Sequence, residues 1–444
     1  MLSQSTRALA EFAATAMTST APKTVRESLH KTLVDSIGVG IAGQRTPEHQ
    51  RLRNAWPASA GEARLWGDAE PMDASSAVML NGVALCMLEL DEGNKFARGH
   101  PGAHVLPAVI AEAERVDASG KGLLDAFLAG YEVAARLARA FTPTPGLHPH
   151  GHWGAVGAAA AVGRLNAFTT AQLAEAMDAA AGLALASPFS SAMRGTFVRN
   201  TWVGAAGVNG MTAARLAAAG LGSLHDTGAA TFGALLGSVD DDELLRDLGA
   251  RWEISGGYYK RHSSCNYTHP PADAALTLRE DGRFDPDAVT AVTVQTHALA
   301  IPLSSTAPET RLAAMFSIPH VVATALVHGH VSPEAFTEAS LDEAQVARIR
   351  DLTTVEFDRE IDAARPAGRG ARVIVALADG GTLTAEVPNA MGDADHHPFT
   401  RADIDAKLER LVGAGQLTRI HESVSALEAG ASARDALGLL RSMT

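Results

Sequence analysis

Histidines and acids gather in residues 88–108, which read LELDEGNKFARGHPGAHVLPA. Its stretch DEGNKFARGHPGAH, residues 91–104, holds Asp91, Glu92, Lys95, Arg98, His100 and His104. Histidine titrates near neutral pH, so His100 close to Asp91 is a candidate for moving a proton. Taken alone, a solvated connection is the better interpretation, since most mixed-charge stretches lie at the surface. The segment follows an apolar run, however, and polar residues at the end of a buried element are held rigidly, as catalysis requires.

A second histidine group, His148, His150 and His152, lies in GLHPHGHWGAVG. Histidines spaced by two or four residues can share a zinc ion. No acidic residue or cysteine accompanies them, and an apolar helical run follows at once. A single catalytic histidine at the start of a helix, His148, is therefore favoured over a three-histidine metal site.

Two further segments supply cations and a thiol. Arg199 stands among small residues in SAMRGTFVRNTWVGAAGVNG, where an arginine either covers a helix end or clamps a substrate carboxylate. The segment YYKRHSSCNYTHPPADAA carries Lys260, Cys265 and His269. Cys265 with a neighbouring histidine could form a nucleophile, although a buried structural thiol is the favoured interpretation.

Composition excludes several classes of protein. The formal net charge of −13 disfavours nucleic acid as the main partner. Two cysteines, Cys86 and Cys265, form neither a disulfide framework nor a cysteine-based zinc site, which favours the cytoplasm. The N-terminus lacks the pattern of a signal peptide, and the apolar runs are too short to cross a membrane. No glycine-rich loop sits between a strand and a helix, so the sequence predicts no nucleotide or redox cofactor.

The elements that must position these residues change in type along the chain. Up to about residue 250, apolar residues recur at helical spacing in residues 24–43, 75–90, 120–141, 170–186 and 208–222. Residues 288–298 then alternate as a strand does, and residues 371–388 indicate a hairpin turning at Asp379 to Gly381. Helical periodicity returns in residues 400–415 and 422–443. We therefore expect a mainly α fold: a helical domain over residues 1–269 and 396–444, with an α+β lid domain at residues 270–395.

Taken in order, these motifs resemble the MmgE/PrpD family. The resemblance covers essentially the whole chain and rests on DSIGVGIAG, NGVALCMLELDEG, HPGAHVLPAVIAEAE, HPHGHWGAVGAAAAVGRL, YKRHSSCNYTHPPADA, FSIPHVVATALVHG and TRADIDAKLERL. The family includes 2-methylcitrate dehydratase, cis-aconitate decarboxylase and iminodisuccinate epimerase. It implies a large helical domain with an inserted α+β lid, a cofactor-free homodimer, and an active site between the domains.

The resemblance also implies roles for single residues. Matches to the family's motifs are Asp91, His100, His148, Lys260, Cys265 and His269. Asp91 is followed by Glu92 where the family has a second aspartate, and His100-Pro101 is followed by Gly102 where it has serine. Three other departures are Arg199 for a lysine, His320 for a tyrosine, and Lys95 near a threonine position. These departures disfavour decarboxylation.

We therefore predict a cofactor- and metal-independent hydro-lyase acting on a small di- or tricarboxylic acid. In this hypothesis His148 is the base, and His100, steadied by Asp91, assists the leaving hydroxyl. Lys260 and Arg199, with Lys95, Cys265 and His269, bind the substrate, and His320 closes the pocket from the lid. Alternatives are an epimerase of an iminodisuccinate-like dicarboxylate using His148 and Lys260, a cis-aconitate decarboxylase-like enzyme, or a non-catalytic carboxylate-binding protein. A metal-dependent hydrolase is a fourth and more distant alternative.

Overall fold

The helical domain is built as the periodicity predicts. The computed structural model describes residues 2–222 and 225–441. Its long helices are α1 (Leu2–Thr15), α2 (Lys23–Gln44), α3 (Pro47–Ala55), α4 (Ala74–Cys86), α5 (Pro101–Val116), α6 (Gly120–Ala140), α7 (Trp153–Leu165), α8 (Thr170–Ala181) and α10 (Val198–Ala218). Shorter helices are α9 (Phe189–Met193), α11 (Thr227–Ala230) and α12 (Asp241–Leu245). Within the described residues, no helix combines the length and apolar character that crossing a membrane requires.

Local signals explain where these helices begin. The Asp73 side chain accepts the backbone N–H of Ser76 and caps α4. Thr169 caps α8 and forms a reciprocal capping box with Gln172. Helix α4 is apolar on all sides and is buried, as expected for such a sequence.

Helices α4 and α10 cross at two glycines. A Cβ placed on Gly82 of α4 would lie only 2.5 Å from the Cα of Gly204 in α10. Both positions must therefore lack a side chain for the helices to approach this closely. This crossing brings the start of α10, with Arg199, toward the chain that leaves α4.

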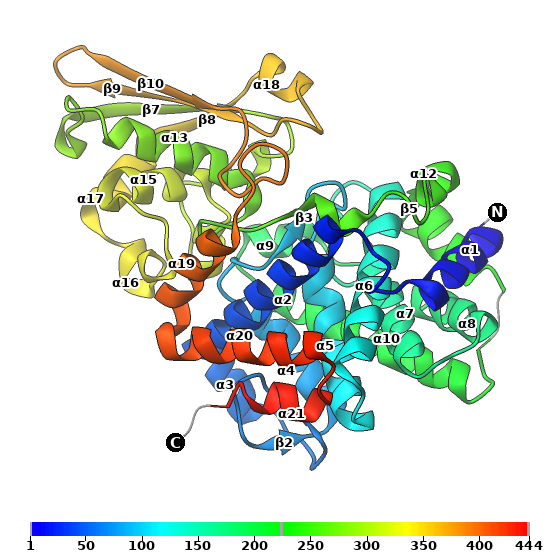
Figure 1. Cartoon of the computed structure of the whole chain (residues 1–444). Helices are drawn as coiled ribbons and strands as arrows, with labels where there is room; N and C mark the ends of the chain where they lie inside the picture. Colours follow the sequence, from blue (N-terminus) through cyan, green and yellow to red (C-terminus); the bar gives the residue numbers. More distant parts are fainter. Residues whose placement is uncertain (1, 223–224, 442–444) are drawn as a thin grey trace.

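The second domain packs helices against a four-stranded sheet (Figure 1). Its strands are β7 (Val289–Thr296), β8 (Thr353–Phe357), β9 (Ala371–Leu377) and β10 (Thr382–Val387), in the order β10-β9-β7-β8. Its helices are α13 (His269–Arg279), α14 (Arg311–Met315), α15 (Ile318–His328), α16 (Glu338–Leu341), α17 (Ala344–Asp351) and α18 (Arg359–Ala363). The hairpin of β9 and β10 confirms the prediction at residues 371–388. The sequence did not predict β8, because it pairs in parallel with β7 and no tight turn announces it.

The chain then returns to the helical domain through α19 (Arg401–Val412), α20 (Ala414–Ala429) and α21 (Ala433–Gly438). In Figure 1 the orange α19 and the red-orange α20 lie against the blue α2, α21 packs against α20, and Leu408 and Val424 are buried in the helical domain's core. Lys407 of α19 donates to Asp35 Oδ1 (2.7 Å) and to the carbonyl oxygen of Leu90 (2.8 Å). The predicted last helix, residues 422–443, is not continuous: the left-handed Gly430 ends α20, and α21 starts again at Ala433. Its last predicted residues, Ser442 and Met443, lie outside the described residues.

Three pairs of very short strands hold loops in place, and two of these pairs join segments far apart in the chain. They are β1 (Ala63–Arg64) with β2 (Pro71–Met72), β3 (Gly93–Asn94) with β6 (Gly257–Tyr258), and β4 (Phe141–Pro143) with β5 (Gly237–Val239). The pairing of β3 with β6 matters most for function, because it fixes residues 88–100 beside Lys260.

Candidate active site

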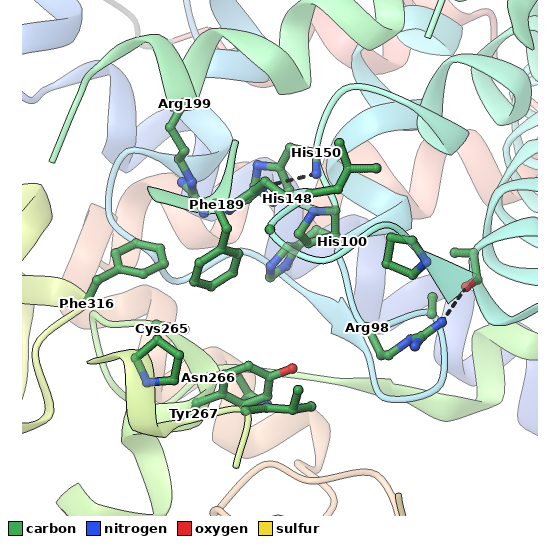
Figure 2. A pocket seen from close by; sticks show the side chains of 18 of the residues that line it. Arg98, His100, His148, His150, Phe189, Arg199, Cys265, Asn266, Tyr267 and Phe316 are labelled. Atoms are coloured by element: carbon green, nitrogen blue, oxygen red, sulfur yellow. Dashed lines mark hydrogen bonds between the residues drawn. The ribbon is translucent and has the colours of Figure 1, made fainter. Parts of the chain in front are cut away.

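A cavity of about 610 Å³ is lined by residues of both domains (Figure 2). Five residues that the sequence singled out line it: His100, His148, Arg199, Lys260 and Cys265. Asp91 is buried directly behind them and contacts His100 and Lys260. The structure therefore brings together four segments that lie far apart in the chain.

His100 stands just before α5, where Pro101 occupies the first helical turn. Its Nδ1 lies 2.7 Å from the carbonyl oxygen of Glu92 and 3.0 Å from Oδ2 of Asp91. The Glu92 carbonyl oxygen can only accept a hydrogen bond, so Nδ1 carries the proton and Nε2 of the neutral ring keeps a free lone pair. Burial lowers the pKa of His100, while Asp91 acts to raise it. The ring is thus a neutral base whose orientation is fixed by backbone and carboxylate.

His148 has the opposite arrangement. The backbone N–H of His150 donates to its Nδ1 at 3.1 Å, the bond drawn in Figure 2. A backbone N–H only donates, so Nδ1 has no proton and the neutral ring carries it on Nε2. Burial, then Arg199 and the neighbouring histidines, hold the pKa of His148 well below its usual range. His148 is therefore a neutral N–H donor.

His150 is a site residue to which the sequence gave no separate role. Its ring centroid lies 4.4 Å from that of His148 and 5.2 Å from that of His100. Both of its ring nitrogens are buried without a hydrogen bond to the described residues, and burial holds its pKa well below the usual range. Among the described residues, no three or more histidine, cysteine or acidic side chains are arranged to hold a metal ion. His152 turns away from the other two and contacts the carbonyl oxygen of His148 at 2.8 Å.

The two cations at the inner end of the cavity are already paired. Arg199 contacts Glu89, and Lys260 Nζ lies 3.3 Å from Glu89 Oε2 and 3.1 Å from Asp91 Oδ1. We call these four residues the inner ion cluster; two cations meet two carboxylates in it. Burial acts to raise the pKa of Asp91, but the charges of Lys260 and Arg199 beside it outweigh burial and hold the pKa below its usual range. The sequence did not single out Glu89, because it stands inside an apolar run.

Three predicted site residues, Lys95, His269 and His320, do not line the cavity. Lys95 Nζ lies 3.0 Å from both Asp393 Oδ1 and Asp395 Oδ2.

His269 Nε2 lies 3.2 Å from the carbonyl oxygen of Ser264, and its ring packs on His262. His320 is buried in the core of the α+β domain, with Nδ1 3.4 Å from Arg350. The expected lid role of His320 does not match this position. Motif order gives a residue's place along the chain but not the direction of its side chain.

Cys265 lines the cavity as a neutral thiol. Burial raises its pKa to about 11. Since the thiolate is the nucleophile, this environment favours a role in shaping the wall over nucleophilic attack.

Glu92 and Gly102, two departures from the family pattern, are direct neighbours. Glu92 accepts hydrogen bonds from Tyr131 Oη at 2.5 Å and from the Gly102 N–H at 3.2 Å. A Cβ on Gly102 would lie 2.7 Å from Glu92 Oε2, so the longer acid occupies the space that glycine leaves. Burial raises the pKa of Glu92 to about 8.

Comparison with known proteins identifies the family of the chain. Models of the MmgE/PrpD N-terminal and C-terminal domains match residues 7–244 and 262–428. The chain therefore belongs to the MmgE/PrpD family, as its motifs predicted. It is 25% identical over 458 residues to cis-aconitate decarboxylase-like protein oryM of Aspergillus oryzae, covering 94% of this chain and 93% of that protein. The family and this relative together indicate an enzyme of the lyase type.

Proposed function

We propose that this chain is a hydro-lyase that removes a proton next to a carboxylate of a small polycarboxylic acid. The observation that carries the proposal is the pair of neutral imidazoles, His100 and His148, with opposite protonated nitrogens on one cavity. Proton abstraction beside a carboxylate needs a base and a donor for the charge that develops. The two rings supply one of each.

The geometry exchanges the roles that the sequence predicted for the two histidines. His100 Nε2 takes the proton from carbon, while Asp91 and the Glu92 carbonyl hold Nδ1. The C–H electron pair becomes the new C=C bond and the C–O bond breaks. His148 keeps its proton and donates a hydrogen bond from Nε2–H to the carboxylate oxygen on which negative charge develops. The departing hydroxide takes the proton from His100 and leaves as water, which returns His100 to its neutral state.

Each contribution has a known order of magnitude. A well-placed general base contributes about 10²–10⁴-fold to the rate. One fixed hydrogen-bond donor to developing charge contributes about 10²–10³-fold. The inner ion cluster adds a fixed field without net charge, and so helps to orient Asp91 beside His100.

Decarboxylation is the second candidate, and the name of the Aspergillus oryzae relative favours it. In that reaction a carboxylate leaves as CO₂ and the electron pair left on carbon takes a proton from an acid in the cavity. The Nε2–H of His148 would then stabilise the charge on the remaining carboxylate. No proton abstraction by His100 is needed to start this reaction.

The experiment incubates the chain with 2-methylcitrate, citrate and cis-aconitate in deuterated water, followed by NMR. Dehydration appears as a new alkene from a hydroxy acid, and decarboxylation as CO₂ with deuterium in the product. Deuterium entering the substrate without net reaction would support the epimerase alternative instead. No reaction and no exchange with any of the three would contradict the proposed activity.

A further inference from the structure

A second pair of cations lines the same cavity, away from the inner ion cluster. Arg98 lies between β3 and α5, and Arg369 immediately before β9. Figure 2 shows Arg98 and Arg199 on opposite sides of the imidazoles. We call Arg98 and Arg369 the outer arginines.

The outer arginines keep most of their donors free. Arg98 Nη2 donates to the carbonyl oxygens of Phe141 and Ala138, and Arg369 Nη2 donates to the carbonyl oxygen of Lys95. Across the described residues, Nε and Nη1 of both side chains have no hydrogen bond, and neither arginine forms an ion pair. A guanidinium has five N–H donors in a planar fork, which fits a carboxylate.

Nearby charges do not neutralise this pair. Lys95 forms ion pairs with Asp393 and Asp395. Arg365 Nε lies 2.8 Å from Asp362 Oδ1. The ring of Tyr267 lies 6.0 Å from the Arg369 guanidinium carbon. Burial holds the pKa of Arg98 below its usual value. Tyr267 acts to raise this pKa, and the charge of Arg369 acts to lower it. Two like charges are thus held at one cavity wall with no carboxylate between them.

A bound anion would relieve that repulsion. Arg369 is only 9% exposed, so water screens its charge poorly. The wall beside the outer arginines is apolar, with Phe141, Leu299 and Pro302. A ligand that satisfies both features has a carboxylate at one end and a hydrocarbon portion behind it.

We propose that Arg98 and Arg369 bind a substrate carboxylate that is remote from the reacting carbon. The inference rests on the proposed function for the position of the reacting carbon at the histidines. It assigns the substrate class as a polycarboxylate whose carboxylates are separated by a hydrocarbon portion. The outer arginines, and not Arg199 and Lys260, then supply the available positive charge.

The test is equilibrium binding of propane-1,2,3-tricarboxylate by calorimetry, because this probe has no hydroxyl group to eliminate. Arg98→Met and Arg369→Met each keep an unbranched stem in place of the arginine's aliphatic part and remove the charged guanidinium. Arg365→Met is the matched control, since that arginine is nearby but paired with Asp362. We expect each outer substitution to weaken binding by about 10- to 100-fold, and the control to change it by less than about twofold.

Charge-retaining variants separate recognition from misfolding. Arg98→Lys and Arg369→Lys should recover part of the affinity, because charge remains but the bidentate fork is lost. Unchanged binding in both methionine variants would overturn the proposal. So would a wild-type chain that does not bind the probe, or loss of binding in the Arg365→Met control to the same extent.

The binding result is independent of turnover. A chain that binds the probe through the outer arginines but shows neither turnover nor deuterium exchange would disprove the lyase and leave the binding site intact. If the chain turns over substrate but both outer variants bind the probe as the wild type does, the binding site is disproved and the lyase proposal stands.

Discussion

The two ends of the cavity hold cations in opposite ways. At the inner end, Arg199 and Lys260 are buried and contact Glu89 and Asp91. At the outer end, the guanidinium hydrogen bonds of Arg98 and Arg369 to the described residues all go to backbone carbonyl oxygens. The inner end is therefore electrically balanced before any ligand arrives, and the outer end is not.

The comparison separates two uses of the same residue types. A cation with a buried acidic partner fixes that acid, because separating the two leaves an unpaired buried charge. A cation without one can take its partner from the ligand. The sequence offered Arg199 and Lys260 as the carboxylate binders, whereas the structure shows their charges already matched.

The largest expected effect concerns the histidines between the two ends. His100→Gln removes the free lone pair of a titrating base, and we expect proton abstraction to slow by about 10²–10⁴-fold. His148→Gln keeps an N–H near the position of Nε2, so its loss should be smaller. Deuterium exchange into substrate measures both, and the exposed His330→Gln is the control. A larger loss in His148→Gln than in His100→Gln would reverse the assignment of roles.

Glu89→Gln removes one carboxylate from the inner ion cluster, so that the inner end, like the outer end, carries positive charge that is not balanced. Arg199 loses its acidic partner and Lys260 keeps only Asp91, so we expect the free energy of unfolding to fall by about 3–5 kcal/mol. Urea unfolding measures this change. Glu62→Gln removes a surface ion pair with Arg434 and should cost about 0–1 kcal/mol. Equal effects of the two substitutions would show that the inner pairing is not important for stability.

Gly102→Ser tests the packing against Glu92. This buried acid lies behind the inner end of the cavity and, within the described residues, pairs with no cation. The added Cβ would lie 2.7 Å from Glu92 Oε2, and such overpacking costs about 1–3 kcal/mol. Glu92→Asp withdraws the carboxyl group and should restore part of that stability. A double-mutant cycle should give a coupling of about 0.5–3 kcal/mol, and strictly additive effects would refute the spatial compensation.

The last prediction concerns a pH dependence of folding stability at Glu92. Its pKa is raised from 4.5 to about 8 by burial, so between these values the folded chain keeps a proton that the unfolded chain has lost. Folding stability from this residue therefore falls as pH rises through that window. Glu92→Gln has no such proton, so its stability relative to wild type should increase with pH across the window. A constant difference in urea unfolding at all pH values would contradict the raised pKa.

Residue spacing predicted the elements better than it predicted side-chain directions. Helices and the β9–β10 hairpin have periodic or turn signals of their own, and they formed as expected. Of the residues given roles, His100 and His148 line the cavity, while Lys95 and His320 do not. Nothing in the sequence shows which way a side chain points from a loop or helix.

The tautomers of His100 and His148 could not be predicted from the sequence either. They depend on which backbone atom meets each imidazole: the Glu92 carbonyl oxygen at His100 and the His150 N–H at His148. Neither contact has a residue-type signature. The two-residue pairing of β3 with β6 is likewise too short to produce a pattern, although it places Lys260 beside Asp91.

The link from Lys407 to Asp35 and the Leu90 carbonyl has a consequence for how the enzyme is made. On the ribosome, Asp35 and Leu90 leave the exit tunnel long before Lys407 is added to the chain. A nascent chain that ends before α19 lacks the Lys407 donor to Asp35 and to the Leu90 carbonyl oxygen. A prematurely terminated product therefore carries every histidine of the site but lacks this link between the last helices and the loop that carries Asp91.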